Sequence, residues 1–301
     1  MRLRHTSLRR AHLLPWRSKG LWPGFGGAPF GFLLITDKTE TLLCHERVPD
    51  GFAPAGAEPA TGCKRFTRAP SGLPNSLLAA LPLFGPPSVI VMGTPVATER
   101  SEASWVRTIL HEHFHQWQTG LPNYFERAQA LNLRGRDRTG MWMLNYPFPY
   151  ARADVVKAQA MASRALANAL AARCTPDFYP RFDDYLRSRW AFEAAAGAKN
   201  WRYIEFQLWQ EGVARWTEIT LGKSYPDTEV AKSAAELEER TLASLRSPDM
   251  PADKRDFVYS YGAGEAMLME ACSAGWRRHY PTMLSLGSLL LEARSSCGRP
   301  D

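Results

Sequence analysis

The segment His111-Glu112-His113-Phe114-His115 constrains the fold of this 301-residue chain more than any other feature. It follows the pattern H-E-x-x-H within a stretch that reads as one helix, with Ser101 as its N-cap and Gly120 as its C-cap. On a helix, positions i and i+4 share a face, so His111 and His115 can bind one metal ion. Glu112 lies about 100° further round and can reach a metal-bound water. Two neutral imidazoles suit Zn²⁺ and leave room for a third protein ligand.

The same helix allows a second interpretation. The face with the two outer histidines also holds Ser104, Thr108 and Gln118, as an ordinary solvated face would. His113 falls on the apolar side of the helix, and we expect it to be a hydrogen-bonded core histidine and not a ligand. The metal interpretation therefore depends on finding a third ligand elsewhere in the chain.

Two later segments resemble motifs of the gluzincin branch of zinc metallopeptidases, specifically its aminopeptidase-like members. Residues 210–218, Q-E-G-V-A-R-W-T-E, are similar to that family's glutamate helix, N-E-G-F-A-x-x-x-E. Residues 259–262, Y-S-Y-G, are similar to its Y-x-K-G motif, with Tyr261 in place of the lysine. The strand, the H-E-x-x-H helix, the glutamate helix and the tyrosine helix also follow one another in the family's order.

The resemblance implies a role for each matching residue. Glu211 would be the third zinc ligand, and Glu218, two turns further along the same face, would be a hydrogen-bonding partner of a ligating histidine. Tyr259 would stabilise the oxyanion of the tetrahedral intermediate, with Tyr261 as the alternative donor. Together with Glu112 as the base, this describes a hydrolase that cleaves peptide or protein substrates with one Zn²⁺ per chain. Gly212, next to Glu211, should permit close approach of another helix.

Other functions stay open at this point. The chain could be a catalytically silent zinc-binding scaffold, or a protein-interaction module with the same fold. Two departures from the family bear on specificity: 95 residues separate His115 from Glu211, and the G-x-M-E-N segment that holds a free amine is absent before His111. The sequence therefore does not distinguish an exopeptidase from an endopeptidase.

The pattern along the chain predicts an α+β fold, mostly helical, with a small N-terminal β-sheet. The family resemblance implies that this fold is zincin-like. We expect an irregular tail over residues 1–28 and one domain over residues 29–301, with a helical insertion at about residues 121–199. Strands are expected at Pro29–Thr36, Glu40–Cys44 and Ser88–Met92, the first two as a hairpin, and residues 49–87 as a turn-filled connection.

The helical half of the chain is punctuated by one aromatic loop. Further helices are expected near 154–173, 182–196, 200–221, 230–245, 259–274 and 281–293. Residues 139–150, rich in aromatic residues and proline, form a loop that could line a substrate cleft or cap the core. The family resemblance implies that a substrate lies along the strand Ser88–Gly93, as an added strand.

Charge and composition exclude some classes of function. The chain has 37 Lys and Arg against 30 Asp and Glu, a formal charge of +7, yet six of these positive charges fall within residues 1–20. The other 281 residues are thus nearly neutral at +1, which argues against a nucleic-acid binder. No membrane span is expected at the uncharged stretch Gly20–Thr36, because it holds five glycines and two prolines.

The compartment and the oligomeric state stay open. The basic start of the chain is followed by no clear apolar segment of a signal peptide, because Pro15, Trp16, Arg17 and Lys19 interrupt it. The five cysteines form no C-x-x-C. Cys44 and Cys63 could form a disulfide in an exported protein, or all five could be reduced.

Overall fold

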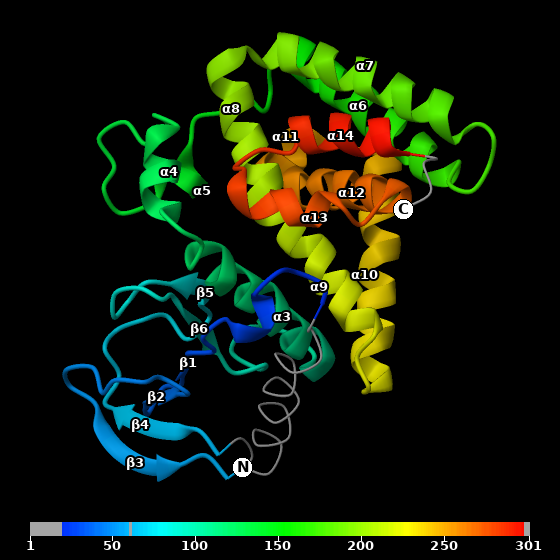
Figure 1. The fold of residues 1–301 in the computed structure, drawn as a ribbon. Helices are drawn as coiled ribbons and strands as arrows, with labels where there is room; N and C mark the ends of the chain where they lie inside the picture. The colour runs from blue at the N-terminus through cyan, green and yellow to red at the C-terminus, as the bar shows by residue number, and fades with distance from the viewer. Residues whose placement is uncertain (1–19, 60–61, 298–301) are drawn as a thin grey trace. The chain divides into compact units, whose positions relative to one another are not determined.

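The computed structural model describes residues 20–59 and 62–297, and it has the predicted α+β fold (Figure 1). Its contacts divide the chain into two compact units. The sheet unit holds the described residues up to Tyr124 together with Thr217–Ala235. The helical unit holds Phe125–Trp216 and the described residues from Glu236 onward. Residues 1–19, with six of the basic side chains considered above, lie outside the described part.

The sheet unit is built on a six-stranded mixed sheet with the order β3-β4-β2-β1-β6-β5. The predicted hairpin is confirmed, because β1 and β2 pair antiparallel, and β6 lies parallel to β1 on its other side. The strands are β1 Phe32–Ile35, β2 Glu40–Leu43, β3 Ala53–Ala57, β4 Lys64–Arg68, β5 Leu78–Leu81 and β6 Val89–Gly93.

The prediction for residues 49–87 was wrong, because this segment contributes β3, β4 and β5. These strands are largely half-buried or exposed and rich in alanine or charged residues, so they show no clear alternation of apolar and polar residues. Their presence also corrects the role expected for Ser88–Gly93. Strand β6 pairs with β1 on one side and with β5 on the other, so β5 is the edge strand.

Helix α3, Glu102–Thr119, carries the H-E-x-x-H segment and packs on the sheet. The hydroxyl of Ser101 accepts a hydrogen bond from the backbone N–H of Ser104, which confirms the predicted N-cap. The Trp105 indole donates to the carbonyl of Gly93 at 2.8 Å. The Gln116 amide donates to the carbonyls of Gly31 and Ser88 at 2.8 and 2.9 Å. The buried contact joins Phe32, Leu34, Ile90 and Met92 of the sheet to Trp105, Val106, Ile109 and Leu110 of α3.

Residues 20–28 were expected to be irregular, and they contain the short 3-10 turn η1, Phe25–Gly27. Trp22 and Phe25 are buried, and both rings contact Phe114 and Trp117 of α3. The Trp22 indole also donates to the hydroxyl of Thr217 at 3.0 Å. This segment therefore belongs to the core of the sheet unit.

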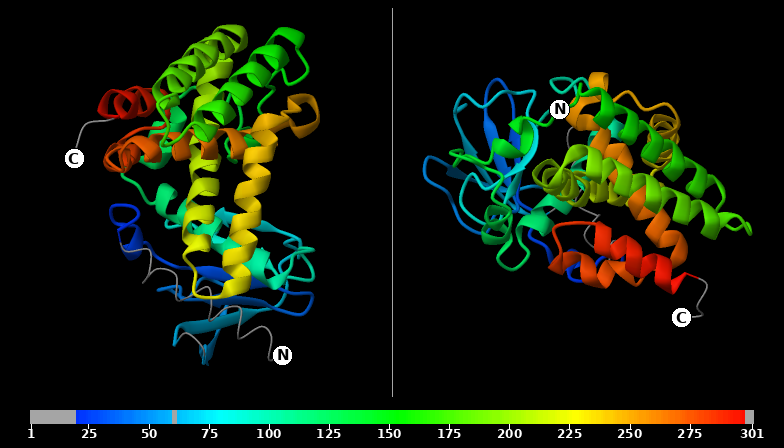
Figure 2. Two further views of the ribbon diagram at one scale, coloured as in Figure 1. Left: turned by 90° about the vertical axis from the view of Figure 1, so that its right-hand side faces the viewer. Right: turned by 90° about the horizontal axis from the view of Figure 1, so that it is seen from above.

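The helical unit is an assembly of helices in which α6 and α7 lie side by side and α12 contacts α6, α14 and η2 (Figure 2). Most predicted helices are confirmed within a few residues, but 281–293 is broken and α4 was not predicted. The elements are α4 Tyr124–Ala130, α5 Trp142–Asn145, α6 Ala153–Ala171, α7 Phe178–Ala196, α8 Ala198–Gln207, η2 Leu208–Gly212, α9 Val213–Lys223, α10 Thr228–Arg246, α11 Met250–Asp253, η3 Lys254–Asp256, α12 Phe257–Cys272, α13 Trp276–His279, η4 Tyr280–Thr282 and α14 Gly287–Ser296.

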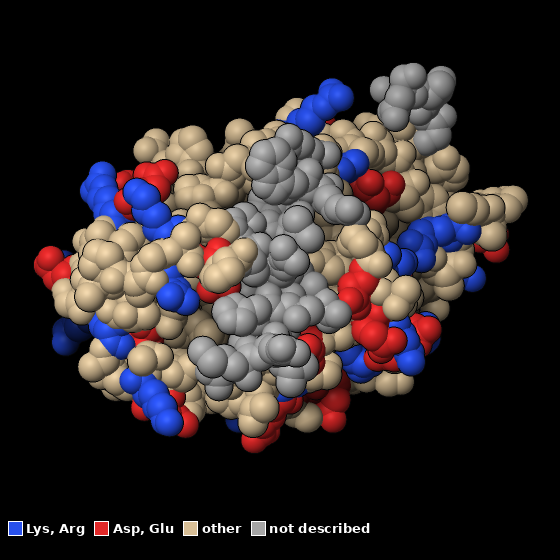
Figure 3. All heavy atoms as spheres, turned by 90° about the horizontal axis from the view of Figure 1, so that it is seen from below, with Lys and Arg blue, Asp and Glu red and all other residues tan. Residues whose placement is uncertain are grey.

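Helices α9 and α10 begin in one unit and end in the other. Among the described residues, none of the helices has the length and apolar character needed to cross a membrane. On the face drawn in Figure 3, Lys and Arg side chains of the described residues are interspersed with Asp and Glu.

Two disulfides close short loops, one in each unit. Cys44 is bonded to Cys63, as one of the two sequence interpretations anticipated, and Cys272 is bonded to Cys297. Cys174 is a free, exposed thiol.

Candidate metal centre

His111 and His115 point their Nε2 atoms at each other across one turn of α3. The two Nε2 atoms are 3.0 Å apart, and the residues are only 6% and 8% exposed. Two nitrogens bound to one tetrahedral zinc at 2.0–2.1 Å would lie about 3.3 Å apart. The helix thus presents both imidazoles at nearly the spacing that a shared ion requires.

The partners of the other ring nitrogens indicate which form each imidazole takes. The Nδ1 atom of His115 lies 2.6 Å from the amide oxygen of Gln118, and Nδ1 of His111 lies 3.3 Å from a carboxylate oxygen of Glu218. Each oxygen is an acceptor, so each Nδ1 carries the hydrogen in the neutral imidazole and each Nε2 presents a lone pair. Two Nε2 atoms 3.0 Å apart need a hydrogen or a cation between them, and a cation suits the tautomers in which both Nδ1 atoms carry the hydrogen. The donor set fits Zn²⁺ in this respect.

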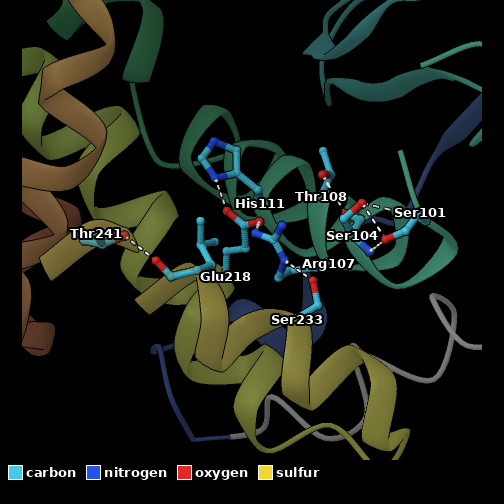
Figure 4. Close-up of polar contacts among 9 residues, drawn as sticks. Ser101, Ser104, Arg107, Thr108, His111, Glu218, Ser233 and Thr241 are labelled. Atoms are coloured by element: carbon cyan, nitrogen blue, oxygen red, sulfur yellow. Dashed lines mark hydrogen bonds and ion pairs between the residues drawn. The ribbon is translucent and has the colours of Figure 1, made fainter. Parts of the chain in front are cut away.

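Glu218 lies beside His111, one of the two histidines predicted to bind the metal. Its carboxylate also pairs with the guanidinium of Arg107, and both side chains are almost fully buried (Figure 4). Arg107 in turn donates to the hydroxyl of Ser233 at 3.2 Å. A carboxylate that accepts from Arg107 and faces Nδ1 of His111 fixes the orientation and the tautomer of that ring.

The third histidine of the segment has no part in this arrangement, as predicted. The His113 ring is buried against Phe25 and Phe30, with ring centroids 4.9 and 5.2 Å away, and its Nδ1 lies 2.9 Å from the amide oxygen of Gln116. Burial lowers the pKa of His113 to about 4, although the Gln116 hydrogen bond opposes the shift. His113 is therefore a neutral core residue at pH 7.

Glu211 belongs to the helical unit and lies in a π-helical turn, η2, between α8 and α9. Gly212 lies against Gly262 of α12, so closely that a Cβ on Gly212 would come within 2.4 Å of the Gly262 Cα. The predicted close helix approach is therefore present. π-turns occur often at functional sites, because they change the direction of a side chain within an otherwise regular helix.

Arg255 links Glu211 to Tyr259 and was missed in the sequence. Its guanidinium lies 3.3 Å from an oxygen of Glu211 and donates to the Gln207 amide and the Tyr259 hydroxyl, each at 3.0 Å. Burial alone would lower the Arg255 pKa, but Glu211 and Tyr259 outweigh it and raise that pKa. The only signal in the sequence is that Arg255 comes one helical turn before Tyr259.

The two candidate tyrosines have different surroundings. Tyr261 is fully buried, packed against Tyr185, Phe192 and Phe257, and burial raises its pKa. Tyr259 is half-buried, and its hydroxyl accepts from Arg255. Since the Arg255 bond uses a lone pair of this hydroxyl, the Tyr259 O–H hydrogen can be donated to another group.

The aromatic loop at 139–150 packs on α8. Trp142 stacks on Phe206 and Tyr146 stacks on Tyr203, with ring centroids 5.4 and 4.2 Å apart. The Tyr203 hydroxyl donates to the carbonyl of Met143 at 3.0 Å. These contacts favour the interpretation that the loop caps the core of the helical unit.

The structure thus gives two sets of predicted residues. His111, Glu112 and His115 lie on α3 with Glu218 beside them in the sheet unit, and Glu112 is 7% exposed. Glu211 and Tyr259 lie in the helical unit, joined through Arg255. That both sets serve one ion stays a prediction. Comparison of the chain with models of protein families, with characterised proteins and with solved structures gave no match.

Proposed function

We propose that the protein is a zinc-dependent peptidase in which His111, His115 and Glu211 bind one Zn²⁺ per chain. The observation that carries the proposal is the pair of buried Nε2 atoms facing each other at 3.0 Å. A cation between the two nitrogens would be bound by both lone pairs, and imidazole nitrogen is a preferred ligand of zinc. A carboxylate as the third ligand leaves a position for water, as in catalytic rather than structural zinc sites.

The register of one helix supports Glu211 as the third ligand. Elements α8, η2 and α9 form an uninterrupted helical run, in which Glu211 and Glu218 are seven residues apart. About two turns separate them, and the π-turn that holds Glu211 sets the direction of its side chain. Glu218 lies beside His111, and among the described residues His111, His115 and Glu211 make up a set of side chains that could hold a metal ion.

Each remaining residue has a defined task in hydrolysis. Zinc bound at these ligands would supply Lewis acidity, polarising the substrate carbonyl and acidifying its bound water. Glu112 accepts the proton of the attacking water and delivers it to the leaving amine. Tyr259 donates a hydrogen bond to the oxyanion, with its hydroxyl oriented by Arg255. Buried Tyr261 is the poorer candidate for this role.

Strand β5 is the part of the sheet to which an extended substrate could pair. It is the edge strand next to β6, and its second edge has no partner strand in the described sheet. A peptide added there would be recognised through main-chain hydrogen bonds, with little dependence on side-chain identity. This replaces Ser88–Gly93 as the proposed substrate strand.

The two disulfides support a further element of the proposal, the compartment. Disulfides form and persist in oxidising environments. We infer that the chain functions in such an environment, where Cys44–Cys63 and Cys272–Cys297 stay oxidised.

The substitution Glu112→Gln tests the catalytic role directly. We expect peptide hydrolysis to fall by a factor of about 1,000 or more, because a base is lost, while zinc content stays at the wild-type value. Cleavage of a peptide library would be followed by mass spectrometry, with exposed Glu229→Gln on α10 as the matched control. Full activity in Glu112→Gln would remove Glu112 from this role. A wild-type chain that binds zinc but cleaves no peptide would favour the scaffold alternative.

A further inference from the structure

The helical unit contains a hollow of about 900 Å³ between the loop 132–147 and the first turn of α8. This volume lies in the range of pockets that bind small ligands or peptide side chains. Lys199, Asn200 and Arg202 line it from α8, and Arg134, Trp142 and Asn145 line it from the loop. None of these residues belongs to the candidate metal centre.

One wall of the hollow is aromatic and rigid. Trp142 and Tyr146 are each only 8% exposed, although both line the hollow. Trp142 stacks on Phe206, and Tyr146 stacks on Tyr203 while its hydroxyl donates to the Asn200 amide oxygen at 3.1 Å. Side chains supported in this way keep the hollow open and give it a flat apolar surface.

The residues that line the hollow include three cations and one acid, so its net charge is positive. Arg134, Lys199 and Arg202 line it, and none of the three forms an ion pair with another described residue. Arg202 donates to the backbone carbonyl of Leu131, at 3.1 Å.

One acidic residue, Asp137, also lines the hollow. Its oxygens accept from the backbone and hydroxyl of Thr139 and from the backbone of Trp142, so it serves to fold the loop. Three cations around an acid that is already hydrogen-bonded attract an anionic ligand.

The primary amide side chains that line the hollow indicate that the anionic ligand is a peptide. Asn132 and Asn145 are exposed on its rim, and the amide side chain of Asn145 has no partner among the described residues. An amide offers a donor and an acceptor side by side, which matches the N–H and C=O of a peptide backbone. A free phosphate or a lone carboxylate would use the cations but not this pairing.

We propose that the hollow binds an acidic segment of a peptide, with its carboxylates at Arg134, Lys199 and Arg202 and an apolar side chain against Trp142 and Tyr146. The identification of this peptide as substrate rests on the proposed peptidase function. Lys199 and Glu211 are twelve residues apart on one helical run, which is about 18 Å. An extended peptide covers that distance in about five or six residues. The favoured substrates therefore carry acidic residues about that far from the cleaved bond.

Isothermal titration calorimetry on the full chain tests this proposal. The probe is a hexapeptide with three Glu and one Phe, compared with the same peptide carrying Gln in place of Glu. We expect the acidic peptide to bind at least 10-fold more tightly than the Gln peptide, with an affinity that falls at high salt. The triple variant Arg134→Gln, Lys199→Gln, Arg202→Gln should lose at least 10-fold in affinity.

Matched controls distinguish binding at the hollow from a non-specific effect of the charge of the protein. Lys157, Arg164 and Arg240 are exposed cations of the helical unit outside the hollow, and their triple Gln variant should bind like wild type. The single charge reversal Lys199→Glu, at an exposed position, replaces the triple variant as the test if that variant fails to fold. Equal binding by wild type and Lys199→Glu would overturn the proposal. So would inorganic phosphate that binds as tightly as the peptide, because the site would then be one for small anions.

The same titration distinguishes this proposal from the peptidase function. Binding to the hollow should survive EDTA treatment and the substitution His115→Ala, because none of the proposed zinc ligands lines the hollow. Acidic-peptide binding by a wild-type chain that takes up no zinc even after repletion would support the hollow and contradict the peptidase function. Zinc-dependent cleavage with no preference for acidic peptides would give the opposite result.

Discussion

At the scale of single residues, the buried carboxylate of Glu218 contacts both a cation and a candidate zinc ligand. It pairs with the Arg107 guanidinium, and its other oxygen lies 3.3 Å from Nδ1 of His111. Arg107 is 5% exposed, and a buried cation needs a counter-charge whether or not His111 binds a metal. The same carboxylate thus stabilises a buried cation and orients a candidate zinc ligand.

Replacing Glu218 by Gln should affect zinc binding and stability together. We expect zinc affinity to weaken by about 10- to 100-fold, because the His111 ring loses its acceptor carboxylate. We also expect the free energy of unfolding to fall by about 3–5 kcal/mol, because buried Arg107 keeps its charge and loses the carboxylate of Glu218. Competition with a chelator measures the first effect and denaturant titration the second, with Glu229→Gln as control. Unchanged zinc affinity with lowered stability would limit Glu218 to pairing with Arg107.

At the scale of elements, the position of Glu211 depends on the crossing of η2 and α12. Gly212 and Gly262 let the two backbones meet, and a Cβ on Gly262 would come within 2.7 Å of the Leu208 carbonyl oxygen. The sequence predicted the close approach at Gly212 from the local pattern alone. It could not predict Arg255 as the partner of Glu211, because that contact exists only once α12 crosses the π-turn.

The substitution Gly212→Ala should push η2 and α12 apart at their crossing. The new methyl group would collide with backbone, which cannot rotate away, so we expect a loss of about 1–3 kcal/mol or more. For a chain of this size that corresponds to a fall in Tm of about 3–10 °C, measurable by differential scanning calorimetry. Gly27→Ala is the matched control, because a Cβ there meets no atom within 4 Å. A wild-type Tm in Gly212→Ala would contradict the crossing described above.

At the scale of the whole molecule, the α+β class and most helices follow from the sequence, because amphipathic periodicity and caps are local. Ser101 and Gly120, for example, delimit α3 as predicted. Strands β3 and β5 were missed because their side chains are mostly small and half-buried or exposed, so their pairing depends on neighbouring strands. The histidine pair was predictable because both residues lie on one helix. The edge strand was not, because edges are a property of the whole sheet.

The central claim is that two histidines of one helix and a glutamate from a distant part of the sequence bind one zinc ion. Elemental mass spectrometry on the purified wild-type chain, His115→Ala and Glu211→Gln tests it directly, with His45→Ala and Glu193→Gln as controls. The account predicts about one zinc per chain in the wild type and both controls, and little or none in the two site variants. A wild-type chain without zinc after repletion would contradict the metal centre. Full zinc in Glu211→Gln would contradict the third ligand.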